Sequence, residues 1–130
     1  MAEDVVPLEE VEQIRFSVWL KKRGIRHTAS ANGAKRTVNA GKKLLAMGMS
    51  PGFPDIEVPY PIKHRTGMYV YCGLYIEMKR SKGGKLSEEQ ADWLEFLRSQ
   101  GYYADCAHGC AEAIEIFNHY ISLGNNPIAA

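Results

Sequence analysis

The chain has 130 residues, of which 45% are hydrophobic and 24% are charged, with a formal net charge of +1. This composition is that of one globular domain over residues 1–130, and it excludes two domains or a disordered tail. Three cysteines are too few for a disulfide framework, and no hydrophobic run reaches the ~18 residues of a membrane span. The first four residues include two acids where a secretory signal would be basic, so we expect a cytoplasmic protein with no membrane partner.

The charges are strongly segregated along the chain. Between positions 14 and 54 there is no acidic residue, but there are nine basic ones: Arg15, Lys21, Lys22, Arg23, Arg26, Lys35, Arg36, Lys42 and Lys43. A second basic cluster consists of Lys79, Arg80, Lys82 and Lys85. Segregation of this kind lets a nearly neutral protein present one face to a polyanion, although solvated basic helix faces without a ligand would give the same pattern.

The first predicted element is a helix over residues 8–23, where Val11, Ile14 and Val18 recur at helical spacing until Gly24. The next predicted elements are a short strand at residues 25–28, a turn at residues 29–35 and a second helix at residues 37–47. Prolines at positions 51 and 54 exclude regular structure in the segment that follows.

The second half of the chain alternates strands and helices. The predicted elements are strands at residues 55–58 and 68–78, joined as a hairpin by a loop at residues 59–67, a helix from Ser87 to about Gly101, a strand at residues 102–107 and a helix ending near Gly124. The capping-box pattern of Ser87 and Gln90 supports the first of these helices. Because a strand, a helix and a further strand usually form a right-handed parallel pair, we expect an α/β fold in which helices flank both faces of a small mixed β-sheet.

Charged side chains stand at the ends of the two predicted hairpin strands. Asp55 begins one strand, and Glu77 and Lys79 lie 22 and 24 residues later, at the end of the other. Residues two apart on a strand project from the same face, so Glu77 and Lys79 share a site. If the hairpin brings Asp55 beside Glu77, two carboxylates converge, and a hard cation such as Mg²⁺ or Mn²⁺ would offset their repulsion.

These residues, together with several others, resemble the VRR-NUC (virus-type replication-repair nuclease) family of the PD-(D/E)xK nuclease superfamily, in a stand-alone phage or bacterial form. The resemblance extends over about residues 9–121. It is carried by His27, Asn32, Gly33, Lys35 and Arg36, by the run at residues 47–55, by Glu77, Met78 and Lys79, and by residues 83–90 followed by Trp93. The pair of motifs at Asp55 and at residues 77–79 is a weak signal alone, but its order and spacing with the other segments make it specific.

The resemblance implies a restriction-endonuclease-like core that hydrolyses DNA phosphodiester bonds with Mg²⁺ or Mn²⁺. Asp55 and Glu77 would bind the metal, joined by the carbonyl oxygen of Met78, and Lys79 would orient or deprotonate the attacking water and stabilise charge on the phosphate. These roles suit in-line hydrolysis, which needs a Lewis acid, a positioned water and a cation. The alternative is that Lys79 is an ordinary strand lysine paired with a glutamate.

Two further site residues are implied, each with a structural alternative. The family carries an acid on the first helix, and Glu9, with Gln13 one turn later, fits best among the three candidates Glu9, Glu10 and Glu12. Acids in a first turn also complement the helix dipole, which would explain all three without catalysis. The resemblance places Gln90 near the metal, whereas the capping box alone accounts for both Gln90 and Ser87. Trp93 is expected in the core.

The resemblance also implies contacts with DNA and a partner subunit. The predicted DNA-binding residues are His27, Asn32, Lys35, Arg36, Lys42, Lys82 and Lys85. Stand-alone members resemble Holliday junction resolvases, so we expect a homodimer that cuts branched DNA such as four-way junctions. The alternatives are a nuclease that prefers flaps, ends or linear duplex, and a DNA-binding module that keeps the fold without cutting.

Overall fold

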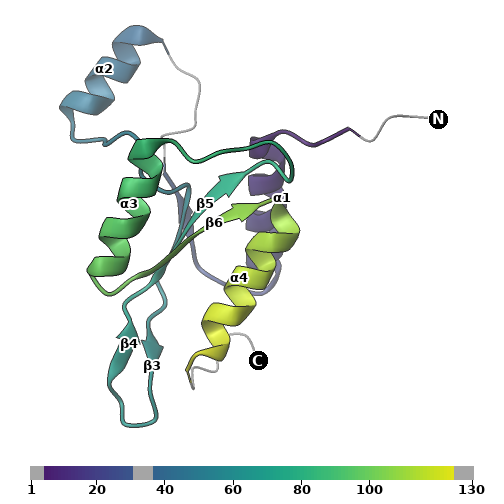
Figure 1. The fold of residues 1–130 in the computed structure, drawn as a ribbon, viewed down its shortest axis with the longest axis vertical. Coiled ribbons are helices and arrows are strands. Elements are labelled where there is room, and N and C mark those ends of the chain that lie inside the picture. Colours follow the sequence, from purple (N-terminus) through teal and green to yellow (C-terminus); the bar gives the residue numbers. More distant parts are fainter. Residues whose placement is uncertain (1–4, 31–36, 125–130) are drawn as a thin grey trace.

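The computed structural model describes residues 5–30 and 37–124. Its elements in chain order are α1 (Glu9–Lys22), β1 (Thr28–Ala29), α2 (Val38–Ala46), β2 (Ile56–Val58), β3 (Ile62–Lys63), β4 (Tyr69–Tyr71), β5 (Leu74–Lys79), α3 (Glu88–Ser99), β6 (Tyr103–His108) and α4 (Cys110–Ser122). Figure 1 shows how they are arranged.

The main sheet has four strands in the order β1-β2-β5-β6. Strands β2 and β5 are antiparallel, and β5 and β6 are parallel, with α3 as the connection between them. Helix α3 covers one face of this sheet, and α1 and α4 cover the other (Figure 1). The predicted α/β class, with a small mixed sheet between helices, is therefore confirmed.

Side chains of β5 alternate between two hydrophobic cores. Leu74, Ile76 and Met78 belong to the larger core under α1 and α4, and Tyr75 belongs to a smaller core under α3. The period of two that separates these side chains also places the polar pair at positions 77 and 79 on the α3 face of the strand. The strand thus supplies both the packing of the domain and the polar residues at its end.

The predicted first helix is confirmed, but its buried face is not the one that carries Ile14 and Val18. Helix α1 buries Phe16 and Leu20 completely, whereas Ile14 and Val18 are 62% and 43% exposed. The helix turns Phe16 and Leu20 toward α4, where Phe117 is also fully buried. Val11, Ile14 and Val18 follow the helical period as well, so periodicity alone did not distinguish the two faces.

The predicted long strand at residues 68–78 is divided in the structure. The break lies at Cys72 and Gly73, before the chain enters the main sheet, and the N–H of Cys72 donates to the carbonyl oxygen of Gly101 at 2.8 Å. Before this break, β4 pairs with β3 in a separate two-stranded sheet, so the segment predicted as a loop at residues 59–67 contains a strand. This hairpin projects beyond the main sheet (Figure 1).

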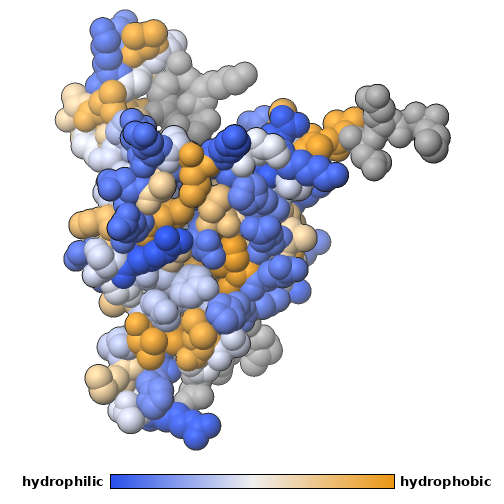
Figure 2. Space-filling model, viewed as in Figure 1, coloured by the Kyte–Doolittle hydropathy of each residue, from blue (hydrophilic) through white to orange (hydrophobic). Residues whose placement is uncertain are grey.

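Helix α2 stands away from the two cores, at the end opposite the β3–β4 hairpin (Figure 1). None of the residues of this helix, from Val38 to Ala46, is buried. Val38 and Leu45 are 75% and 49% exposed, and apolar and polar surface alternate over this helix in Figure 2. The hydroxyl oxygen of Thr37 caps the helix by accepting from the N–H of Ala40 at 3.1 Å.

Candidate active site

The register of the main sheet brings Asp55 and Glu77 together. Ile56 pairs with Ile76 in the antiparallel β2–β5 ladder, so the residue before Ile56 lies beside the residue after Ile76. The carboxylate of Asp55 accepts a hydrogen bond from the N–H of Met78 at 2.7 Å across this pair. The convergence expected from a hairpin is therefore present.

Glu77 and Lys79 are buried side by side on β5. Their exposed fractions are 2% and 7%, and Lys79 Nζ lies 3.9 Å from Glu77 Oε1. Gln90, at the start of α3, donates from Nε2 to the same Glu77 oxygen at 2.8 Å. The other oxygen, Oε2, is buried and has no hydrogen-bond partner among the described residues. A buried carboxylate oxygen without a donor is a candidate ligand atom for a cation.

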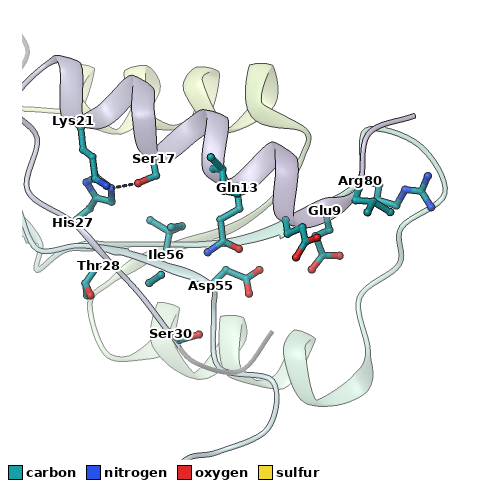
Figure 3. Close-up of a pocket in the computed structure, with 14 residues that line it drawn as sticks. Glu9, Gln13, Ser17, Lys21, His27, Thr28, Ser30, Asp55, Ile56 and Arg80 are labelled. Carbon is teal, nitrogen blue, oxygen red and sulfur yellow. Dashed lines mark hydrogen bonds between the residues drawn. The ribbon is translucent and has the colours of Figure 1, made fainter. Parts of the chain in front are cut away.

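Of the three acids in the first turn of α1, the structure brings only Glu9 to this place. One carboxylate oxygen each from Glu9, Asp55 and Glu77 lies within 4.8 Å of the other two. Figure 3 shows Glu9 reaching from α1 toward Asp55. Glu10 is exposed, and Glu12 is buried beside Gly109, where a Cβ atom would meet its Oε2 at 2.6 Å.

Burial and mutual repulsion make these carboxyl groups hard to ionise. Burial, together with the charge of Asp55, raises the pKa of Glu77 to about 8, although the ammonium group of Lys79 opposes this. Burial also raises the pKa of Asp55 and of Glu9. A cluster of three hard oxygen donors, one of them buried without a partner, fits a divalent ion such as Mg²⁺ or Mn²⁺.

Gln90 serves the helix cap and the carboxylate cluster at once. Its Oε1 accepts from the N–H of Ser87 at 2.9 Å, its own N–H donates to the Ser87 hydroxyl, and its Nε2 donates to Glu77. The two interpretations of this glutamine are therefore compatible, because its two amide atoms have different partners. Trp93, one turn later, is partly buried and packs edge-to-face on Phe53, with 5.1 Å between the ring centroids.

Gly52 is a structural requirement of the site that sequence reasoning did not assign. Its φ is +86°, and a Cβ atom there would lie 2.6 Å from the carbonyl carbon of Glu89 and 2.8 Å from the backbone nitrogen of Gln90. The loop before Asp55 can press against the start of α3 only because this residue has no side chain. The sequence signal that could have identified this glycine is its position between two prolines, at residues 51 and 54.

The predicted DNA-binding residues lie in different parts of the molecule. His27 lies beside α1 and uses both ring nitrogens in hydrogen bonds, with Ile25 O and Ser17 Oγ at 2.8 and 2.7 Å. Lys42 on α2 is exposed, as are Lys82 and Lys85 in the loop after β5. The remaining three, Asn32, Lys35 and Arg36, lie outside the described residues.

A cavity of about 310 Å³ opens over the carboxylate cluster. Glu9, Asp55, Glu77 and Gln90 line one side, and residues of α2 and of the following loop, such as Leu45, line the other. The acidic cluster is therefore accessible from the surface on the side where the basic helix α2 stands. This geometry suits a site for an anionic substrate that binds through a cation.

The sequence matches a family model, the VRR-NUC domain, over residues 10–111. The chain belongs to the VRR-NUC family. The matched range contains Asp55, Glu77, Lys79 and Gln90 and begins one residue after Glu9. Membership makes the chain a nuclease-type domain, which implies that it binds DNA.

A solved structure described as a VRR_NUC domain protein shares this fold. The TM-score is 0.75, with 22% sequence identity over 97% of this chain and 98% of the other. A search of curated proteins finds no match. Among the described residues, no helix of this VRR-NUC domain combines the length and the apolar character needed to cross a bilayer.

Proposed function

We propose that this VRR-NUC domain is a metal-dependent DNA endonuclease that acts as a homodimer on branched DNA such as four-way junctions. The observation that carries the proposal is the convergence of Glu9, Asp55 and Glu77 within 4.8 Å, with Lys79 Nζ 3.9 Å from Glu77. Three acids and a buried lysine at one accessible point are the groups that phosphodiester hydrolysis needs.

In this proposal Asp55 and Glu77 hold Mg²⁺ or Mn²⁺, with the carbonyl oxygen of Met78. Glu9 completes the acidic side of the site. The bound ion would polarise a phosphoryl oxygen and lower the pKa of a water molecule. The N–H of Met78 fixes the Asp55 carboxylate at 2.7 Å, so this ligand is oriented before the ion binds.

Lys79 and Gln90 act on the reacting groups from the protein side. Lys79 orients the attacking water as an ammonium group, or takes the proton of that water as a neutral amine, and its positive charge stabilises the charge that develops on the phosphate. Gln90 is a positioning residue, because its amide holds one Glu77 oxygen at 2.8 Å and leaves the other without a donor. The exposed Lys42, Lys82 and Lys85 would contact the DNA backbone without sequence preference.

The homodimer and the branched substrate rest on the family resemblance. Each chain offers one carboxylate cluster among its described residues. A two-fold axis would place two such clusters so that two strands of a junction are cut symmetrically.

The test is cleavage of labelled four-way junction, flap, duplex and single-stranded DNA in Mg²⁺, in Mn²⁺ and in EDTA, with the mass of the protein measured by light scattering. We expect a dimer that nicks junctions fastest and is inactive in EDTA. Asp55→Asn and Lys79→Ala should abolish cleavage, whereas Glu115→Gln, an exposed change on α4, should not. Equal cleavage by wild type and both site variants would refute the proposed mechanism. DNA binding without cleavage in any metal would favour the non-cutting module.

A further inference from the structure

A second and larger cavity, of about 810 Å³, extends from the carboxylate cluster along α1. Its α1 wall includes Glu9, Gln13, Ser17 and Lys21, which are spaced four apart and lie on one face of the helix (Figure 3). The opposite wall is formed by residues from β1 and the start of β2, including Thr28, Ser30 and Asp55. We call this cavity the α1 groove. Its volume is in the range of sites that enclose whole ligands.

The acidic side chains of the α1 groove are gathered at its metal end. Glu9 and Asp55 lie there, with the exposed Arg80 beside them, and Gln13, in the middle, is uncharged. At the far end stands the exposed ammonium group of Lys21 (Figure 3). A groove that joins a candidate metal site to a cation suits a chain with regularly spaced negative charges, because one phosphate can face the metal and a later one the lysine.

Lys21 is the group at the far end that is suited to bind a phosphate. The carbonyl oxygen of Ile25 accepts a hydrogen bond from His27 Nδ1 at 2.8 Å, so in the neutral ring Nε2 accepts a hydrogen bond from the Ser17 hydroxyl at 2.7 Å. Both the imidazole and the Ser17 proton are thus engaged within the wall. The function of His27 in the groove is to position Ser17, whereas Lys21 extends from the next turn of the helix.

Near the metal end, a residue of the groove wall has an unsatisfied hydroxyl group. Ser30 Oγ is buried and has no hydrogen-bond partner among the described residues. The N–H of Ser30 donates to the carbonyl oxygen of Asp55 at 2.9 Å, which places the backbone of Ser30 beside that of Asp55. An unsatisfied hydroxyl group in the wall of a groove is a candidate donor for a ligand there.

We infer that the α1 groove holds the strand of nucleic acid that leads away from the scissile phosphate, and that Lys21 binds one of its phosphates. The inference rests on the proposed action on DNA and adds the path of the strand. The twelve residues from Glu9 to Lys21 span about 18 Å at 1.5 Å per residue. At ~3.4 Å per nucleotide of a stacked strand, Lys21 contacts a phosphate about five nucleotides from the cut.

The test measures DNA binding without cleavage, with the full chain in EDTA and a fluorescein-labelled four-way junction. Lys22 is the matched control, because it is the neighbouring exposed lysine of α1 and does not line the groove. Each phosphate contact contributes about 0.9 to the slope of log K against log salt concentration. Relative to 1 M salt, this slope makes one contact worth about fivefold in affinity at 0.15 M salt. We expect Lys21→Ala to bind the junction about fivefold more weakly than the wild type, with a salt slope smaller by about 0.9. Lys22→Ala should keep the affinity and the salt slope of the wild type.

Ethylation interference then identifies the phosphate. We expect a position where ethylation weakens binding of the wild type and of Lys22→Ala but has no effect on Lys21→Ala. Identical interference patterns for Lys21→Ala and wild type, equal losses in both lysine variants, or no binding at all would overturn the inference. If Lys21→Ala lacks the phosphate contact but the wild type cleaves no DNA in Mg²⁺, only the proposed nuclease activity is refuted. If the wild type cleaves junctions but Lys21→Ala and the wild type give identical interference patterns, only the proposed strand path is refuted.

Discussion

Replacement of Glu77 by glutamine should stabilise the metal-free protein at high pH. Burial and the charge of Asp55 raise the pKa of Glu77 to about 8 from an ordinary value of 4.5. The folded protein therefore keeps a proton that the unfolded chain releases. The contribution of this group to the free energy of unfolding is complete below about pH 4.5, is lost as the pH rises toward 8, and stays lost above that.

The size of this effect follows from the shift in pKa. At about 1.4 kcal/mol per pKa unit, ionisation of Glu77 costs the folded protein up to about 5 kcal/mol. The side-chain amide introduced by Glu77→Gln carries no charge, and its oxygen can still accept the hydrogen bond from Gln90 Nε2. Because Asp55 shares the repulsion, we expect the variant to exceed the wild type by about 2 to 5 kcal/mol at pH 9 and by no more than about 1 kcal/mol at pH 5.

Urea denaturation in EDTA at pH 5 and pH 9 measures this difference, with Glu115→Gln as the control for a lost surface charge. The free energies of unfolding of the control and the wild type should agree within about 0.5 kcal/mol at both pH values. A Glu77→Gln variant that is no more stable than the wild type at pH 9 would refute the electrostatic argument. Saturating Mn²⁺ should reduce this difference by about 2.7 kcal/mol at 100 times Kd, because only the wild type then gains binding energy.

Three further predictions concern the support of the site. Gln90→Ala and Ser87→Ala should each destabilise α3 by about 1 kcal/mol, because each removes the capping box. Only Gln90→Ala should weaken Mn²⁺ binding, by about 10- to 100-fold, because it alone leaves Glu77 Oε1 without its donor. Equal calorimetric Kd values for the two variants would contradict this role. Gly52→Ala should reduce Tm and cleavage more than Gly48→Ala, since both have positive φ but only position 52 lacks space for a Cβ atom; equal losses would show that the close approach to α3 is unimportant. The Mn²⁺ affinity of the wild type should rise by up to about tenfold per pH unit from pH 6 to 8, because the ion displaces the proton of Glu77, whose pKa is about 8; calorimetry should find no such rise if that proton is absent.

Local patterns in the sequence determined several parts of the candidate site. The spacing of Glu77 and Lys79 placed both side chains on one face of a strand, and the antiparallel pairing expected for the hairpin brought Asp55 to them. The capping box located the start of α3 and with it Gln90. Each of these features depends on residues within a few positions of one another or on one strand pairing, and such short-range rules can be read without a fold.

Tertiary packing decided what several local patterns left open. Helical periodicity fits two faces of α1, and the choice of the face with Phe16 and Leu20 was made by contact with α4. That rotation of the helix directs Glu9 to the carboxylate cluster and creates the α1 groove on the side of Lys21. The division of the predicted long strand likewise depends on a hydrogen bond from Cys72 to Gly101, 29 positions away. Contacts between distant parts of the chain arise only when its surfaces pack together, and local propensity contains no information about them.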